Sequence, residues 1–123
     1  METLGVLLYG YNLEDSKAIE QSLRTITNQD IIIVSGSKKE DLKIMDILDK
    51  GPEECYEDKE NKILLFLGFS DSEVGAVLKE FPKSDTLVRP IFCGLTEENI
   101  NWTLEYLVEH LIEEDKYWAA NKK

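Results

Sequence analysis

Residues 62–70 read KILLFLGFS, and this stretch decides the fold that we predict for the chain. Residues 63–67 form a continuous apolar run, which is typical of a strand that is covered on both faces. Gly68 follows where the chain has to turn, and Ser70 with Glu73 three positions later forms a capping box. The stretch therefore predicts a buried strand that leads through a glycine turn directly into a helix.

A second joint of the same kind follows about 25 residues later along the chain. Residues 91–96 read IFCGLT, and Thr96 is placed to cap a last helix that could run to Asn121. We place the preceding strand at residues 86–93. Pro90 lies inside it and removes a ladder hydrogen bond, so we expect an edge strand or a bulge.

The first half of the chain carries a weaker form of this strand-helix-strand-helix unit. Residues 4–10 form an apolar run that ends in glycine, and Asn12 is placed to cap the helix that follows. Residues 31–34 predict a second strand. Residues 37–40 read SKKE, a capping box that predicts the start of a second helix at this point.

Shifting the chain by 58 residues against itself aligns the two units without a gap. The strand-ending glycines coincide in this alignment, in the pairs Gly10 with Gly68 and Gly36 with Gly94. We therefore predict an internal duplication within a single domain. The pseudo-repeats are residues 1–52 and 62–112, and residues 113–123 form a helical extension.

The alternation of strands and helices along the whole chain predicts an α/β fold. Right-handed crossovers make the two strands of each unit parallel. We expect a four-stranded, mostly parallel sheet with helices packed on it, and the two units can be related by a pseudo-two-fold axis. A ferredoxin-like α+β sheet is the alternative, and it fits less well because it needs two consecutive strands without a helix between them. The strand order does not follow from the sequence.

The charge of the chain limits its partners. The net charge is −11, with 7 Lys+Arg against 14 Asp+Glu in residues 1–61 and 7 against 11 in residues 62–123. Because both halves are acidic, we expect no nucleic-acid partner and no docking on anionic membranes. The chain begins without a signal-peptide pattern. Two cysteines, Cys55 and Cys93, are too few for a disulfide framework, so we expect a cytoplasmic protein with reduced thiols.

Two motifs of the second unit occur together. The first is Gly68-Phe69-Ser70-x-x-Glu73, and the second is Leu95-Thr96-x-x-Asn99-x-x-Trp102-Thr103-Leu104-x-x-Leu107. In this order they resemble the bacterial domain of unknown function DUF3783, over residues 62–112. The pair Arg89-Pro90 departs from that family's pattern, where a proline and a lysine in the other order are expected. The resemblance implies relatives but no activity.

Motifs for catalysis and for cofactor binding are missing from the sequence. It contains no glycine-rich dinucleotide loop, no P-loop, no His-Glu-x-x-His and no Cys-x-x-Cys, so we predict no cofactor. His110 is the only histidine, and residues 53–61 do not follow the calcium-loop pattern, so we predict no metal site. Cys93 near a helix start is the one candidate nucleophile, without a base beside it. We lean against an enzyme and name no catalytic residue.

Ligands of open α/β sheets bind beyond the carboxyl ends of the strands. The side chains expected at such a crevice are Tyr11, Asn12, Lys38, Phe69, Ser70, Thr96, Asn99 and Trp102. Three of the four first helical turns are acidic, so the competing interpretation is that these residues only cap helices. In that interpretation Asn99 holds the glycine loop by hydrogen bonds and Trp102 belongs to the core.

Two functions are compatible with these features. The first is a small acidic interaction or regulatory module, a homodimer that uses the last helix or the edge strand. Its contact residues would be Pro90, Tyr117 and Trp118, because aromatic side chains on a polar helical tail are unusual in a monomer. The second is a sensor of an anionic small metabolite at the strand-end crevice, where Lys38 would meet the anion.

Overall fold

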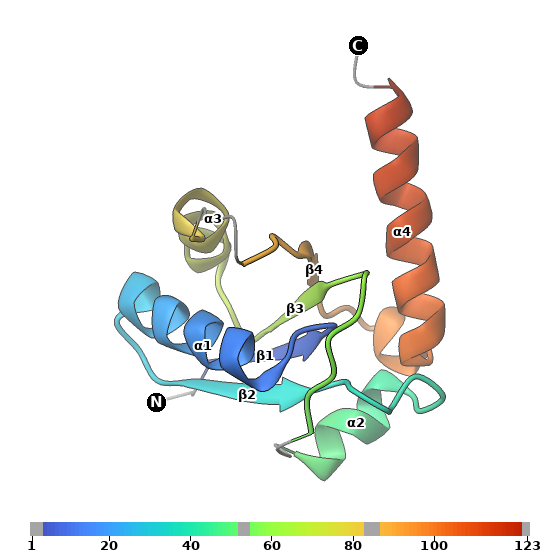
Figure 1. Ribbon diagram of the computed structural model, residues 1–123, viewed down its shortest axis with the longest axis horizontal. Coiled ribbons are helices and arrows are strands. Elements are labelled where there is room, and N and C mark those ends of the chain that lie inside the picture. The colour runs from blue at the N-terminus through green and yellow to red at the C-terminus, as the bar shows by residue number, and fades with distance from the viewer. Residues whose placement is uncertain (1–3, 52–54, 83–86, 122–123) are drawn as a thin grey trace.

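A four-stranded sheet lies between two pairs of helices in the computed structural model (Figure 1). The structure describes residues 4–51, 55–82 and 87–121, and residues 117–121 by their backbone alone. The strands are β1 (Leu4–Tyr9), β2 (Ile31–Ser35), β3 (Ile63–Leu67) and β4 (Ile91–Gly94). The helices are α1 (Leu13–Thr27), α2 (Ile44–Lys50), α3 (Asp71–Glu80) and α4 (Leu104–Asn121), with the short 3-10 helix η1 (Asn99–Asn101) before α4.

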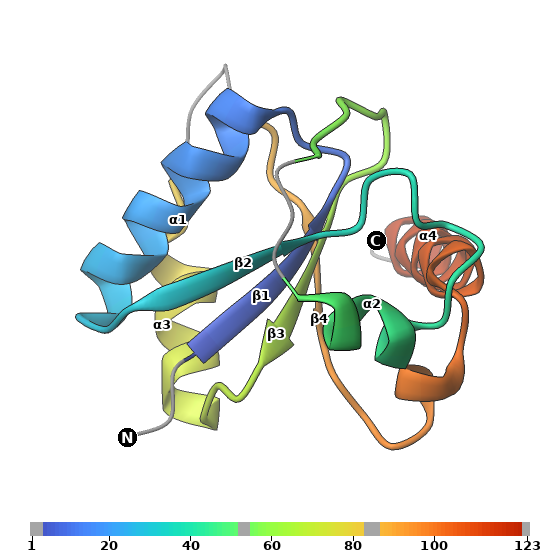
Figure 2. The same ribbon diagram turned by 90° about the horizontal axis from the view of Figure 1, so that it is seen from below.

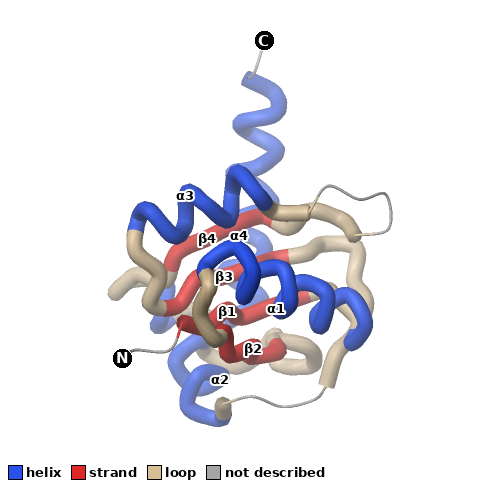
Figure 3. The backbone as a smooth tube through the Cα atoms, turned by 90° about the vertical axis from the view of Figure 1, so that its left-hand side faces the viewer, coloured by secondary structure: helices blue, strands red, loops and turns tan. Residues whose placement is uncertain are grey.

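The strand order is β2-β1-β3-β4, as Figure 3 shows. β1 pairs with β2 in parallel and β3 pairs with β4 in parallel, whereas the central pair of β1 with β3 is antiparallel. The predicted four-stranded, mostly parallel α/β sheet is confirmed. A helix separates every two consecutive strands, so the ferredoxin-like alternative is wrong.

The antiparallel pairing of β1 with β3 is centred on two residues that are 58 positions apart. Leu7 lies opposite Leu65, and the pairs on either side, Gly5 with Leu67 and Tyr9 with Ile63, are equally distant from it. A two-fold axis through the Leu7–Leu65 pair would exchange the two strands. The axis would therefore relate residues that are 58 positions apart, and this is also the shift at which the sequence aligns with itself.

A second contact has the same symmetry. Lys43 forms an antiparallel bridge with Thr103, and the backbone hydrogen bonds Ile44 N–H to Trp102 O (2.9 Å) and Leu104 N–H to Leu42 O (2.9 Å) flank it. Here the offset is 60, since 103 minus 43 is 60, so the second half is two residues longer than the first between the centre of β3 and Thr103. One of the two is added before β4, because Leu7 pairs with Val34 whereas Leu65 pairs with Cys93. The duplication itself stays a prediction, and this geometry is what it would produce.

The helices cover the two faces of the sheet in pairs. Figure 2 shows α1 and α3 on one face and α2 and α4 on the other. Alternate residues of β1 face the two layers: Val6 and Leu8 pack with α1 and α3, and Leu7 packs with α2 and α4. Both faces of the central strands are therefore buried. Each large apolar side chain that is buried in this way stabilises the fold by about 1.5–3 kcal/mol.

The helix predicted to begin at residues 37–40 begins later. α2 starts at Ile44, and two turns at residues 37–38 and 40–41 precede it, with a positive φ of 63° at Lys38. The Ser37 hydroxyl does not cap a helix, because it accepts a hydrogen bond from the backbone N–H of Glu57 (2.9 Å). The capping-box prediction for residues 37–40 is wrong, because Ser37 holds the connection between the halves instead.

The last helix also begins later than predicted. Thr96 and Asn99 bond each other's backbone N–H groups across a turn that leads into η1, whereas α4 starts at Leu104. The Thr103 hydroxyl accepts from the N–H of Tyr106 (3.2 Å) and so takes the capping role that we predicted for Thr96. β4 does lie at an edge of the sheet, as predicted, and it starts at Ile91, directly after Pro90.

α4 extends past the layer that it covers. Its 18 residues span about 27 Å at 1.5 Å per residue. Leu104, Leu107, Val108 and Leu111 are buried against the sheet, and all four described side chains after Ile112 are exposed. The C-terminal half of the helix stands clear of the other elements (Figure 1). None of the described helices is long and apolar enough to span a membrane.

Candidate functional site

The carboxyl ends of the strands do not meet at one edge of the sheet. Because β1 and β3 are antiparallel, their carboxyl ends point in opposite directions. The turn at Gly10 therefore lies at one end of the strands and the turn at Gly68 lies at the other end. The crevice that we expected between these two glycines is therefore not formed. The predicted ligand-binding residues are divided into one group from each half of the chain.

The group from the first half offers little to a ligand. Tyr11 is 1% exposed and its hydroxyl donates to Val88 O, and burial raises the pKa of this tyrosine. The Asn12 side chain accepts from the N–H of Asp15 (2.8 Å) and caps α1. Lys38 is exposed and lies 4.0 Å from Glu57. Lys38, the cation of this predicted group, therefore already faces a carboxylate.

The group from the second half is mostly structural too. Ser70 and Glu73 form the predicted capping box, with Ser70 N–H to Glu73 Oε1 at 2.8 Å and Glu73 N–H to Ser70 Oγ at 3.2 Å. Phe69 is half-buried against Phe66, with ring centroids 4.9 Å apart. The capping box is confirmed, and its atoms are already hydrogen-bonded to each other.

Asn99 closes the loop after β4. It is 5% exposed, its Nδ2 donates to Gly94 O (3.0 Å), and its Oδ1 accepts from the N–H of Thr96 (2.9 Å). The loop-holding role that we considered for this residue is present in the structure. Thr96 and Asn99 thus lie together, but their polar groups are engaged with the loop.

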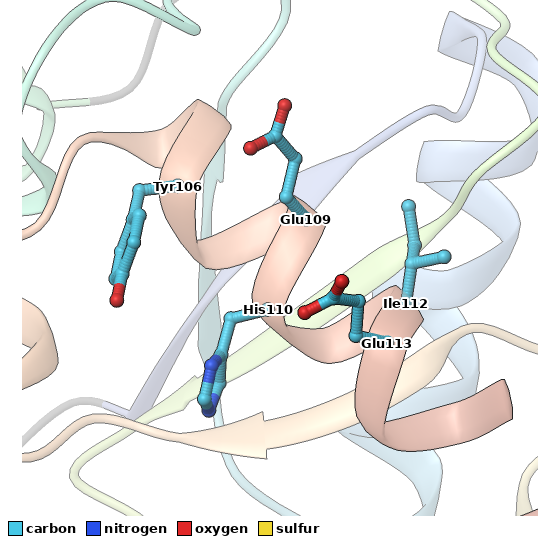
Figure 4. Close-up of a pocket in the computed structure, with 5 residues that line it drawn as sticks. All are labelled: Tyr106, Glu109, His110, Ile112 and Glu113. Atoms are coloured by element: carbon cyan, nitrogen blue, oxygen red, sulfur yellow. The ribbon is translucent and has the colours of Figure 1, made fainter. Parts of the chain in front are cut away.

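Trp102 belongs to a surface that continues along α4. Trp102, Tyr106 and His110 form a row at four-residue spacing, with the Trp102 ring centroid 4.8 Å from Tyr106 and 5.1 Å from His110. Tyr106 is 51% exposed and His110 is exposed as well, and both extend from the same side of α4 (Figure 4). We call these three residues the aromatic row. Sequence reasoning found only Trp102, although the spacing of the row was visible.

Two hollows border the aromatic row along α4. The first has a volume of about 330 Å³ and is lined by Tyr106, Glu109, His110, Ile112 and Glu113, which Figure 4 shows. The second, which we call the acidic hollow, has a volume of about 510 Å³ and is lined by Tyr9, Glu40, Asp41, Asn61, Glu105, Val108, Glu109 and Ile112. Glu109 and Ile112 line both hollows, so the two form one continuous surface.

Tyr9 is the buried polar group of the acidic hollow. Its hydroxyl donates to Glu40 Oε2 at 2.8 Å, and its side chain is 8% exposed. Burial, the hydrogen bond to Glu40 and the charge of Glu40 raise the pKa of Tyr9 to about 12. The hydroxyl therefore stays protonated at neutral pH and holds the Glu40 carboxylate in place. Tyr9 was not among the predicted site residues, because in sequence it is one more member of an apolar strand.

The groups that this surface offers are carboxylates and aromatic rings. Among the described residues, no group of three or more His, Cys, Asp or Glu side chains is arranged to hold a metal ion. Burial, followed by the charge of Glu114, raises the pKa of the Cys93 thiol, which lowers its thiolate fraction. Of the predicted interface residues, Pro90 is buried, and the side chains of Tyr117 and Trp118 lie outside the described residues.

The structure defines a small α/β protein with a mixed four-stranded sheet and an exposed aromatic and acidic face on its last helix. Residues 62–118 match the family DUF3783, a domain of unknown function. The match spans β3, α3, β4 and most of α4, and therefore includes the aromatic row. No curated protein and no solved structure matches the chain.

Proposed function

We propose that this protein is a protein-interaction module that binds its partner on the α4 face, defined as the aromatic row and the two hollows beside it. One observation carries the proposal: Tyr106 and His110 of the aromatic row are exposed side by side on α4, next to the half-buried Trp102. Aromatic side chains are enriched at the centres of protein interfaces because they bury much area with few rotamers. The free C-terminal half of α4 gives a partner further room to dock.

The alternative, a sensor of an anionic metabolite, has less support. It relied on a single strand-end crevice, and those strand ends lie at opposite edges of the sheet. The hollows beside α4 are lined by carboxylates, which repel anions. The cytoplasmic location remains part of the proposal, supported by two free cysteines and by the absence of a membrane-spanning helix among the described residues.

Photo-crosslinking from inside the face tests the proposal. A benzophenone amino acid replaces Tyr106 in the full chain, and a matched variant carries it at Leu78, which is 40% exposed on α3 at the opposite face of the sheet. We expect discrete covalent adducts in cells from position 106 that position 78 does not give. An adduct of the chain with itself would support the predicted homodimer, and an adduct with another protein would support a distinct partner. Equal adducts from both positions, or none from position 106, would overturn the proposal.

A further inference from the structure

The charge on the α4 face defines the chemistry of its partner. We infer that the face binds a basic segment of another protein, whose Lys or Arg side chains lie on the aromatic row and enter the acidic hollow. This inference rests on the proposed function and identifies the kind of partner that the surface fits.

All charged side chains that line the acidic hollow are negative. Four carboxylates line it, from Glu40, Asp41, Glu105 and Glu109, and no Lys or Arg is among its lining residues. The neighbouring hollow adds Glu113. A concave surface with one sign of charge concentrates the opposite sign and speeds its association. A cation is therefore the complement of this surface.

The same charges argue against a second copy of this chain as the partner. Between Leu104 and Lys116, α4 carries five carboxylates (Glu105, Glu109, Glu113, Glu114 and Asp115) against one lysine, Lys116. A symmetric dimer would place the same patch on both sides of the interface. Like charges would then face each other across the contact, which is costly.

The aromatic row supplies a second means of holding a cation. Lys and Arg are attracted to the faces of aromatic rings, most strongly to Trp. The chain makes such contacts elsewhere, with Arg89 4.9 Å from the Phe92 ring centroid and Lys62 5.5 Å from that of Tyr11. Within the described part of the chain, no cation lies over Trp102 or Tyr106. Trp102 is half-buried against the core, whereas Tyr106 is 51% exposed, so Tyr106 presents the larger ring surface to a partner.

The walls of the acidic hollow are held in place before a partner arrives. The N–H of Glu105 donates to Glu40 O (2.9 Å), which joins the start of α4 to residues 40–41. The Tyr9 hydroxyl holds the Glu40 carboxylate from below, and its oxygen can accept a further hydrogen bond. A carboxylate held like that of Glu40 suits the planar guanidinium, which presents five donors, better than the single ammonium of Lys. We therefore expect an arginine-rich segment to bind more tightly than a lysine-rich one.

Binding of labelled peptides to the full chain tests the inference. The probes are nona-arginine, nona-lysine and nona-glutamate, with spermine as a cation that is not a protein segment. The site variant is Glu105→Gln with Glu109→Gln. The control, Asp49→Asn with Glu80→Gln, removes the same charge from exposed residues of α2 and α3 that line neither hollow. Tyr106→Ala and Tyr106→Phe separate the ring from the hydroxyl.

The expected result has three parts. Nona-arginine binds the wild type more tightly than nona-lysine or spermine, and nona-glutamate does not bind. The site variant weakens nona-arginine binding about ten-fold, and the control variant weakens it less than about three-fold. Tyr106→Ala weakens binding, whereas Tyr106→Phe retains it.

Three results would overturn the inference. They are equal losses in the site and control variants, spermine binding as tight as that of nona-arginine, and unchanged binding in Tyr106→Ala. A position-specific adduct at Tyr106 with the chain itself, or with a protein that has no basic segment, would overturn this inference and leave the proposed function standing.

Discussion

Leu7 and Leu65 lie directly opposite each other at the centre of the antiparallel pairing of β1 with β3. They are also the residues that coincide when the chain is shifted by 58 positions. Both are fully buried, and they pack in the same layer against α2 and α4. A symmetric contact at the centre of the sheet therefore joins the two halves. We expect the two leucines to contribute about equally to the free energy of unfolding.

Truncation of either leucine tests this equivalence. We expect Leu7→Ala and Leu65→Ala each to lower the free energy of unfolding by about 2–5 kcal/mol, because each leaves a cavity in the same layer. Urea denaturation measures both values. Leu78→Ala, at a 40% exposed position on α3, is the control and should cost less than about 1 kcal/mol. A loss below about 1 kcal/mol at either buried leucine would contradict the shared role.

The two strand-ending glycines should differ, although they coincide in the repeat. Gly10 has a φ of 93°, and an added Cβ would lie 2.3 Å from Asn61 O, whereas Gly68 has a φ of 79° and nothing within 4 Å. Gly68→Ala should cost about 1–2 kcal/mol through its backbone conformation alone. Gly10→Ala should cost about 3 kcal/mol or more, because a backbone contact adds to it. Thermal unfolding compares the two, and equal costs would show that the Asn61 contact yields easily.

The capping box at the start of α3 should give a pH-dependent contribution to stability. Hydrogen bonds that the Glu73 carboxylate accepts from the Ser70 backbone and from the Ser70 side chain lower the pKa of Glu73. The contribution is therefore present above the ordinary Glu pKa of about 4.3 and is lost as the pH falls through the lower value of the folded protein. The stability gap between wild type and Glu73→Gln should narrow between pH 7 and about pH 3.

A mutation of the cap itself provides the matching measurement. Ser70→Ala should cost about 1 kcal/mol. Ser72→Ala, at an exposed position in the same turn, should change stability by less than about 0.5 kcal/mol. Equal effects of the two serine variants would mean that the Ser70 hydroxyl does not stabilise the helix.

Tyr9 should produce an alkaline transition. The folded protein keeps the Tyr9 proton up to its pKa of about 12, whereas the unfolded chain loses it near 10. Its contribution to stability is thus complete below pH 10 and declines by about 1.4 kcal/mol per pH unit as the pH rises toward 12. Tyr9→Phe should remove the Tyr9 share of this decline and one step in the tyrosinate absorbance, while Tyr11, whose pKa burial also raises, keeps its own share. Tyr106→Phe is the control and should leave both in place.

Much of the fold could be predicted from local patterns. The apolar run at residues 63–67, the Ser70–Glu73 capping box and the edge position of the strand after Pro90 all follow from neighbouring residues. The capping pattern at residues 37–40 was misleading, because the Ser37 hydroxyl bonds Glu57, which is twenty residues away. A local pattern cannot show that a distant backbone group competes for the same side chain.

The candidate site was harder to predict for the same reason. The opposite direction of the two halves depends on the pairing of β1 with β3, which no local pattern determines, and it separates the residues that we expected in one crevice. Tyr9 and Glu40 are 31 positions apart, and only the fold brings them to α4. The row of Trp102, Tyr106 and His110 is local and could have been found from its four-residue spacing.

The central pairing of β1 with β3 has a consequence for how the protein behaves at low concentration. If the two units were separate molecules, the pairing of β1 with β3 would dissociate on dilution. The four-stranded sheet would then exist only above a threshold concentration. Here both strands belong to one chain, so each unit experiences the other at a high and constant effective concentration. The four-stranded sheet is therefore retained at any dilution, and the α4 face remains available when few copies of the protein are present.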